Sequence, residues 1–279
     1  MQLITLNIKK KMPENNKRLY IIAAGLSSRM NGFPKHLCEI DNIGTTNLEH
    51  TIVLAQKYYN DIVVVLNKSL AIEHVLKTLQ ITHKHNVAIK FIESGKGDGH
   101  AVYEAIKHEI DYECVTCIWG DTYFSDNLFD KIDITTNLLT VVCTKEISPY
   151  CYIIPDKNNK ISEIFFKNEI PIGDNDKYLH DQSMFIINVD EFIKYFYDYM
   201  EYCNCISNKF IKIKDLEYSI IKFINWNNAK NKQIEFFALP EIAEPYSMSF
   251  NTSEELKRVK NFNIEQELKD FLKHRCKIK

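Results

Sequence analysis

Short runs of β-branched and apolar residues alternate with amphipathic segments from Arg18 to Trp119. Apolar runs of strand length predict β-strands over residues 18–24, 61–67, 87–93 and 114–119. Helical spacing of apolar residues predicts helices over 47–58, 69–81 and 99–110. A repeated strand, helix, strand order implies a mostly parallel sheet with helices on both faces. Ligands of such sheets bind beyond the carboxyl ends of the strands.

The pattern becomes less regular from Leu138 onward. Strands are predicted over 138–144, 150–156, 160–166, 183–189 and 234–240, and helices over 189–202, 216–229 and 252–262. We therefore predict an α/β fold, a single Rossmann-like three-layer domain with a mostly parallel, mixed central sheet. The domain is expected over residues 18–262, with an N-terminal extension at 1–17 and a C-terminal helix or tail at 263–279.

Composition narrows the classes of function. The chain has 279 residues, of which 45% are hydrophobic and 26% charged, as in ordinary soluble proteins. A net charge of -2 gives no global field for nucleic acid. No apolar run approaches the roughly 18 residues of a membrane span, so we expect a cytoplasmic protein without a membrane partner. The eight cysteines lack paired zinc-type spacings and are expected to be reduced thiols.

The first motif is "IIAAGLSSRMNGFPKHL", which follows the first predicted strand. Gly25 lets the chain turn with N–H groups pointing outward, an arrangement that can cradle phosphate oxygens. Arg29 offers a bidentate donor, and Pro34 restricts the chain before the point charge of Lys35. The alternative is an ordinary strand-to-helix turn with exposed cations. The spacing matches neither of the two commonest glycine-rich nucleotide loops.

"AAGLSSRMNGFPK" resembles the signature loop of the nucleotidyltransferases that activate sugar phosphates, phosphocholine and related compounds. The resemblance implies a nucleotide-diphospho-sugar transferase type of fold, and Arg29 and Lys35 as the catalytic cations. It also implies that the nucleotide is bound by Ala23, Ala24, Gly25, Leu26, Ser27 and Ser28.

The second motif is "ESGKGDGHAVYEAI". Gly95, Gly97 and Gly99 let the backbone approach a flat ligand, so main-chain groups can contact the edge of a base. The stretch resembles the G-T-G-H-A of bacterial N-acetylglucosamine-1-phosphate uridylyltransferases, with Asp98 in place of threonine. These four residues are therefore predicted to bind nucleotide. A helix N-cap is the alternative role for Asp98.

Two further motifs imply a Mg²⁺ site. "CVTCIWGDTYF" places Asp121 just past a strand end, where a carboxylate is well placed to hold this hard ion. "MSFNTSEELKRV" resembles the V-N-T-x-E-D-L that closes many of these domains, which implies Asn251 as the second protein ligand. A turn or capping role is the alternative for Asp121. The resemblance extends from about Arg18 to about Val259.

The acceptor is predicted from "EIFFKNE" and "HDQSMFI". The sugar-phosphate enzymes carry a glutamate, a lysine and an asparagine at these places, whereas this chain has Phe165 or Phe166, Lys167 and Asp181. An aromatic wall and a carboxylate suit an ammonium group. The two phenylalanines could equally fill a sheet face.

The expected reaction is transfer of a nucleoside monophosphate, with CTP favoured, to a small phosphorylated amine or amino-acid-type acceptor. It releases pyrophosphate and serves surface polysaccharide decoration. One alternative is a UTP-dependent sugar-1-phosphate uridylyltransferase, and another is a non-catalytic nucleotide-binding domain. A homodimer is left open, because the aromatic run 192–202 suits an interface or packing on the chain's own sheet.

Overall fold

The computed structural model describes most of the chain. It covers residues 17–25, 27, 30–93, 96–132, 135–147, 151–158, 160–166, 177–210, 217–230, 234–242 and 244–276. Five residues of the predicted site lie outside the described residues, namely Leu26, Ser28, Arg29, Gly95 and Lys167. The predicted N-terminal extension lies outside them as well, except for Lys17.

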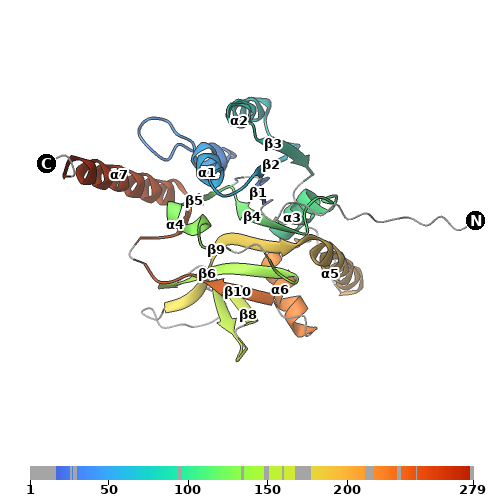
Figure 1. Cartoon of the computed structure of the whole chain (residues 1–279). Coiled ribbons are helices and arrows are strands. Elements are labelled where there is room, and N and C mark those ends of the chain that lie inside the picture. The colour runs from blue at the N-terminus through green and yellow to red at the C-terminus, as the bar shows by residue number, and fades with distance from the viewer. Residues whose placement is uncertain are drawn as a thin grey trace, which may run out of the picture.

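The first half forms the predicted parallel sheet with its connecting helices. Its strands are β1 (Arg18–Ala23), β2 (Asp61–Asn67), β3 (Ala88–Ile92) and β4 (Cys114–Trp119), and its helices are α1 (Asn47–Ala55), α2 (Ile72–Lys84) and α3 (Asp98–Ile106). The strands lie in the order β3-β2-β1-β4, and every neighbouring pair is parallel. In Figure 1, α1 and α2 lie on the other side of these strands from α3.

Alternation along β1 explains why both faces of this half carry helices. Leu19 and Ile21 pack into a core cluster with side chains of α1, whereas Tyr20 and Ile22 pack into a cluster with side chains of α3. Successive strand residues point to opposite faces, so a strand that is apolar throughout needs a cover on each side. This part has the three layers that the sequence predicts.

The second half departs from a simple three-layer arrangement. Its strands are β6 (Leu139–Ile147), β7 (Cys151–Pro155), β8 (Lys160–Phe166), β9 (Lys177–Asn188) and β10 (Ile234–Ala238). The order continues from β4 as β9-β6-β10-β8-β7, and β7 pairs again with β9, which closes a barrel-like ring. Of the pairings described in this ring, that of β10 with β6 is parallel and the others are antiparallel. The predicted mostly parallel sheet therefore describes the first half alone.

The length of β9 makes this closure possible. Its last residues pair with β4, while Leu179, near its start, pairs with Ile153 of β7. Between these parts the register shifts: Phe185 lies opposite Val141, but Asp181 lies opposite Cys143, only two residues further along β6. The sequence predicts a strand only from residue 183, because the polar segment before it lacks an apolar run.

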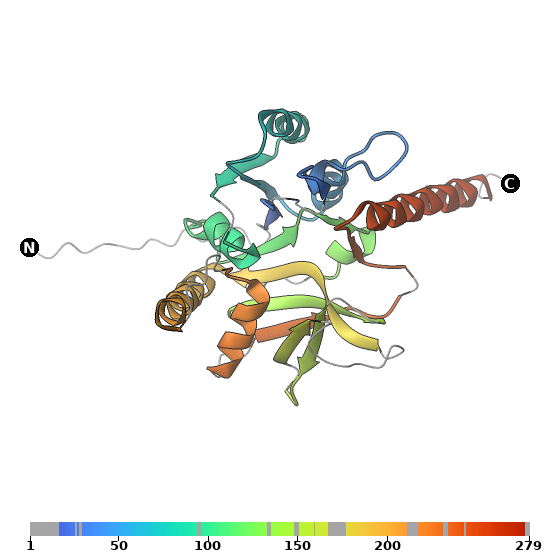
Figure 2. The same ribbon diagram turned by 180° about the vertical axis from the view of Figure 1, so that it is seen from behind.

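The remaining elements surround the sheet. They are η2 (Lys35–Leu37), β5 (Thr122–Phe124), α4 (Asp126–Phe129), α5 (Val189–Phe210), α6 (Ile220–Ala229), β11 (Ser247–Ser249) and α7 (Ser253–Cys276). β5 and β11 form a separate two-stranded antiparallel sheet. α7 extends away from the body of the molecule in both Figure 1 and Figure 2. It continues without a break past residue 262, where the predicted domain ends.

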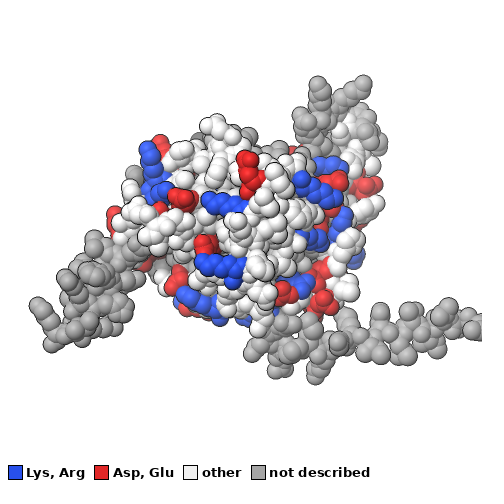
Figure 3. All heavy atoms as spheres, turned by 90° about the horizontal axis from the view of Figure 1, so that it is seen from above, with Lys and Arg blue, Asp and Glu red and all other residues white. Residues whose placement is uncertain are grey.

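The face of the molecule seen from above is mixed in charge. Figure 3 shows Lys and Arg interspersed with Asp and Glu over the described part of one face. A face of mixed charge provides no large single-sign field to attract nucleic acid. Among the described helices, none has the length and apolar character needed to cross a lipid bilayer.

Candidate functional site

A cleft of about 440 Å³ opens at the carboxyl ends of β1 and β4. The segments that line it include the β1 loop, the start of η2, the glycine-rich turn before α3 and the turn after β4. The lining residues are Ile22, Ala23, Ala24, Gly25, Ser27, Lys35, His36, Gly97, Asp98, Ala101, Trp119, Gly120, Asp121 and Glu217. This is the edge of the sheet at which the sequence predicts a ligand.

The β1 loop is closed by its own backbone. The carbonyl oxygen of Ser27 accepts hydrogen bonds from the N–H groups of Met30, at 2.9 Å, and Gly32, at 3.1 Å. The N–H of Lys35 donates to Ser27 Oγ at 3.4 Å, which ties the end of the loop to its start. Lys35 therefore lines the cleft together with the described residues of the predicted loop, which are Ala23, Ala24, Gly25 and Ser27.

Buried side chains fix η2 beneath the cleft. His36 is 3% exposed, and its Nε2 lies 3.1 Å from Thr78 Oγ1. Because the Thr78 hydroxyl donates its proton to the His74 carbonyl, its oxygen accepts from a protonated Nε2 of His36. Burial, and then the charge of His74, lower the pKa of His36 to about 3. The imidazole of His36, the residue after Lys35, is therefore neutral.

Lys35 joins the two predicted metal ligands. Its Nζ lies 2.7 Å from Asp121 Oδ2 and 2.6 Å from Asn251 Oδ1. The lysine side chain is 14% exposed and that of Asp121 32% exposed, so the contact lies in the wall of the cleft. Two side-chain oxygens from distant parts of the chain thus converge on one positive charge. Such a pair of hard oxygen donors also fits Mg²⁺.

Glycine at position 120 brings Asp121 to this point. The N–H of Gly120 donates to the Ile22 carbonyl at 2.9 Å, which continues the pairing of β1 and β4 past the end of β4. A Cβ at Gly120 would lie 2.9 Å from the Ala23 Cβ, too close for any other residue without a shift. The backbone after β4 can therefore lie directly against the β1 loop.

The two-stranded sheet brings Asn251 to the same place. β11 pairs with β5, and the N–H of Phe250 donates to the Asp121 carbonyl at 3.1 Å. The N–H groups of Asn251 and Thr252 donate to Glu255 Oε2 at 2.6 and 3.0 Å, and Thr252 Oγ1 accepts from the Glu255 N–H at 3.2 Å. This is a capping box at the start of α7, and it holds the Asn251 backbone in place.

Asn47 is a supporting residue that the sequence did not single out. Its side-chain amide is buried at the start of α1 and donates to the carbonyls of Gly120, at 3.1 Å, and Thr122, at 3.0 Å. These bonds span Asp121 from both sides and fix the turn that presents its carboxylate. An asparagine in the first turn of a helix is common, so the sequence gives no signal for this role.

The glycine-rich turn is shaped by packing against the start of α6. A Cβ at Gly97 would lie 2.7 Å from the Tyr218 carbonyl oxygen, and one at Gly99 would lie 2.8 Å from the Phe196 ring. Gly97 also has a φ of 101°, in the region that favours glycine. Gly97 lines the cleft, but both glycines are required by these protein contacts. Their role in contacting a base stays a prediction.

Asp98 is not the N-cap of α3, which is Gly97, but the first residue of that helix, and its side chain caps the start of α6 instead. Its Oδ1 accepts from the N–H of Ile220 in α6 at 3.0 Å and from the N–H of Gly99 at 2.7 Å. Burial raises the pKa of this carboxyl, and the backbone hydrogen bonds oppose that effect. Asp98 also lines the cleft, as does Glu217 from the segment before α6, which the sequence did not indicate.

The predicted acceptor residues lie in the barrel-like half. Phe165 is opposite Tyr152 in the pairing of β7 with β8, and Phe166 packs against the main core cluster. Asp181 Oδ2 accepts from Cys151 Sγ at 3.0 Å, and its Oδ1 accepts from the Ser183 N–H at 3.0 Å. None of the three predicted residues is among the described residues that line the cleft. Their role in acceptor binding stays a prediction.

The sequence of the segments that line the cleft is similar to that of known proteins. Residues 19–132, which contain Lys35 and Asp121, match the family model of the MobA-like NTP transferase domain. The bifunctional protein GlmU of Buchnera aphidicola subsp. Schizaphis graminum (strain Sg) is 27% identical over 232 residues, covering 80% of this chain and 46% of that protein. The chain thus spans about half the length of this curated relative.

Solved structures share the fold. An inositol-1-phosphate CTP transferase from T. maritima matches with a TM-score of 0.60 and 12% identity, covering 90% of this chain and 96% of that one. HddC from Yersinia pseudotuberculosis matches with a TM-score of 0.62 and 16% identity, covering 88% of this chain and 98% of that one. A nucleoside-diphosphate-sugar pyrophosphorylase from Vibrio cholerae RC9 matches with a TM-score of 0.62 and 18% identity, covering 88% of this chain and 99% of that one. Together with the sequence matches, these findings confirm that the chain resembles the nucleotidyltransferase superfamily, as its motifs predict.

Proposed function

We propose that this chain transfers a nucleoside monophosphate from a nucleoside triphosphate to a phosphorylated acceptor and releases pyrophosphate. The observation that supports this most directly is the contact of Lys35 with Asp121, both of which line the cleft, and with Asn251. The match of residues 19–132 to an NTP transferase domain supports the same activity.

The reaction is an in-line displacement at the α-phosphorus. An acceptor phosphate oxygen forms the new bond to phosphorus, and the bond to the bridging oxygen of the β-phosphate breaks, so pyrophosphate leaves with the electron pair. Reactions of this type need positioning and charge stabilisation rather than a covalent enzyme intermediate. Lys35 neutralises charge on the phosphates, and Arg29 is predicted to add a bidentate contact.

Asp121 and Asn251 are the residues that would hold Mg²⁺. Bound there, the ion would offset negative charge on the reacting phosphates. Asn47 and Gly120 keep Asp121 in position, and the α7 capping box does the same for Asn251. The β1 loop provides the N–H groups expected to receive the triphosphate.

We propose CTP as the donor and a small phosphorylated amine or amino-acid derivative as the acceptor. The support is the chemistry of Phe165, Phe166 and Asp181, in which aromatic faces and a carboxylate suit an ammonium group. One structural neighbour is a CTP transferase by name. The product would be a cytoplasmic activated intermediate for decoration of a surface polysaccharide.

A UTP-dependent sugar-1-phosphate enzyme is the second candidate. It is favoured by the G-D-G-H-A stretch, because Gly97 and Asp98 both line the cleft. It predicts turnover with sugar 1-phosphates and no need for an ammonium group on the acceptor. A non-catalytic nucleotide-binding domain predicts nucleotide binding without any release of pyrophosphate.

The experiment measures pyrophosphate release with Mg²⁺. CTP, UTP, GTP, ATP and dTTP are each combined with a pool of phosphorylated amines and amino acids, and with a pool of sugar 1-phosphates. Release with CTP and the amine pool supports the favoured substrates, and release with UTP and the sugar pool supports the second candidate. Nucleotide binding without release under every combination contradicts the proposed activity.

A further inference from the structure

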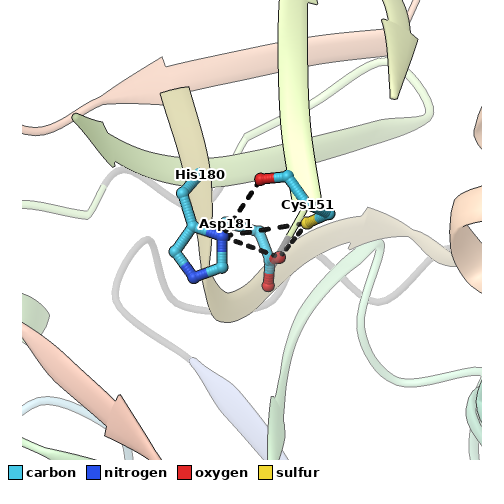
Figure 4. Close-up of side chains that lie close together, drawn as sticks. All are labelled: Cys151, His180 and Asp181. Carbon is cyan, nitrogen blue, oxygen red and sulfur yellow. Dashed lines mark hydrogen bonds and ion pairs between the residues drawn. The ribbon is translucent and has the colours of Figure 1, made fainter. Parts of the chain in front are cut away.

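Three side chains with metal-binding atoms meet in the barrel-like half of the molecule. Cys151 comes from the start of β7, and His180 and Asp181 are consecutive residues of β9 (Figure 4). Cys151 Sγ lies 3.0 Å from Asp181 Oδ2 and 3.8 Å from His180 Nδ1. His180 Nδ1 lies 3.8 Å from Asp181 Oδ2. One sulfur, one nitrogen and one oxygen therefore form a compact triangle.

The irregular course of β9 brings two consecutive residues to one point. In a regular strand their side chains would lie on opposite faces of the sheet. Here the register shift between β6 and β9 begins just after Asp181, and Ser183 has a φ of 58°. His180 Nδ1 lies 3.4 Å from the Cys151 carbonyl oxygen, so the ring turns back toward β7, as Figure 4 shows.

We propose that Cys151, His180 and Asp181 bind a divalent transition-metal ion, with Zn²⁺ as the best match. Zinc takes thiolate, imidazole and carboxylate ligands in tetrahedral geometry with bonds of about 2.0 to 2.3 Å, which places neighbouring ligand atoms about 3.4 to 3.6 Å apart. The observed separations of 3.0, 3.8 and 3.8 Å lie on either side of that range. Reaching it takes changes of about 0.2 to 0.6 Å in these separations.

A fourth side chain supports the orientation of His180. Glu146 Oε2 lies 3.6 Å from His180 Nε2, on the other side of the ring from Nδ1. Without an ion, His180 Nδ1 faces two acceptor oxygens, the Cys151 carbonyl and Asp181 Oδ2. Metal binding therefore requires the ring proton to lie on Nε2, which faces Glu146. A carboxylate behind a ligating histidine is a common arrangement in zinc sites.

The cluster is accessible on one side. Cys151 is 1% exposed, whereas the His180 and Asp181 side chains are 20% and 17% exposed. An ion can therefore enter past His180 and Asp181 and keep a solvent oxygen as its fourth ligand. Binding forms a zinc–sulfur bond, breaks the S–H bond and releases the thiol proton to water.

This site is separate from the proposed Mg²⁺ site. None of its three residues is among the described residues that line the cleft. A thiolate is a soft ligand that Mg²⁺ avoids, so the two sites select different ions. Zinc would use Asp181 Oδ2, which faces Cys151. The other oxygen, Oδ1, accepts from the Ser183 N–H and keeps a lone pair for an acceptor ammonium group.

The test titrates the chelator-stripped full chain with Co²⁺ in excess Mg²⁺, and then with Zn²⁺. The wild type is expected to bind one Co²⁺ with a thiolate-to-cobalt charge-transfer band, which one equivalent of Zn²⁺ abolishes. Glu146→Gln should weaken Zn²⁺ binding by about 10-fold or more. Cys151→Ala should remove the band.

Cys117→Ala is the matched control. Cys117 is a buried thiol in the same core cluster as Cys151, and burial alone raises the pKa of the Cys117 thiol. This variant should keep the band and its affinity. If Cys151→Ala does not fold, His180→Ala replaces it and should lose the tetrahedral spectrum. A wild type without the band, or a band that persists in the folded Cys151→Ala or His180→Ala variant, overturns the proposal. Because the readout is spectroscopic, the result for the zinc site does not depend on whether the protein catalyses nucleotidyl transfer.

Discussion

The ammonium of Lys35 lies 2.7 Å from the carboxylate of Asp121, which follows β4 and is far from it in the sequence. Asn251 completes the contact at 2.6 Å, so three motifs of the sequence meet at one charge. The oxygens that hold Lys35 are also those expected to hold Mg²⁺. The lysine and the metal ion therefore compete for the same donors unless the lysine moves to the phosphates.

Lys35→Met should lower kcat by about 100- to 1000-fold, the usual loss when a group that stabilises transition-state charge is removed. It should also lower the Mg²⁺ concentration for half-maximal activity, because the ammonium no longer competes for Asp121 and Asn251. Initial rates over a range of Mg²⁺ concentrations measure both effects. A variant with lower kcat and an unchanged Mg²⁺ requirement would show that the two cations do not share these oxygens.

Asn251→Ala should raise the Mg²⁺ requirement by at least about 10-fold, because it removes one of two protein oxygens from the proposed site. Asn251→Asp keeps a donor oxygen and should preserve tight Mg²⁺ binding. Isothermal titration with Mg²⁺ in the presence of a non-hydrolysable triphosphate measures the affinity directly. Equal affinities for the wild type and the alanine variant would exclude Asn251 as a ligand.

Gly25 and Gly99 should respond differently to alanine. A Cβ at Gly25 meets no atom within 4 Å, whereas a Cβ at Gly99 lies 2.8 Å from the Phe196 ring. Gly99→Ala should therefore cost about 1 to 3 kcal/mol of unfolding free energy by overpacking. Gly25→Ala should change stability by less than about 0.5 kcal/mol, but should raise the KM for the nucleotide because the methyl group enters the cleft. Urea unfolding measures the change in stability, and nucleotide kinetics measure the change in KM. A destabilised Gly25→Ala protein would show that Gly25 is required for folding rather than for nucleotide binding.

His36 should make stability depend on acid pH. Its folded pKa of about 3 lies below the ordinary value of 6.5, so the unfolded chain binds the extra proton between these values. The stabilisation is complete above pH 6.5 and is lost progressively as the pH falls toward 3. Between pH 7 and pH 5 the loss is about 2 kcal/mol from this residue.

Urea unfolding of the wild type and of His36→Gln at both pH values tests this effect. The variant should lose about 2 kcal/mol less than the wild type over that interval. Equal losses would mean that His36 titrates with an ordinary pKa in the folded protein.

The first half of the fold could be predicted because its signals are local. Apolar runs such as that of β2 and the helical spacing of α1 each define an element without reference to the rest of the chain. The rule that ligands bind at the carboxyl ends of parallel strands then brings Lys35 and Asp121 to one edge. Asn251 could be expected there only through the resemblance, since it is far from both in the sequence.

The second half could not be predicted in this way because its closure depends on long-range pairing. The early part of β9 is polar, and only its pairing with β6 and β7 makes it a strand. For the same reason the sequence gives no sign that Cys151 lies beside His180. Asn47 and Glu217 were missed because their roles come from tertiary contacts alone.

The catalytic role of Lys35 can be tested by comparing two lysine variants in the pyrophosphate-release assay, with the best substrate pair of the wild type. Lys35 contacts Asp121 in the cleft wall, whereas Lys57 forms an exposed ion pair with Asp126 at 3.3 Å. We predict that Lys35→Ala loses about 100-fold or more in kcat while remaining folded, and that Lys57→Ala retains wild-type turnover. Full activity in a folded Lys35→Ala protein would exclude a catalytic role for Lys35 in this cleft.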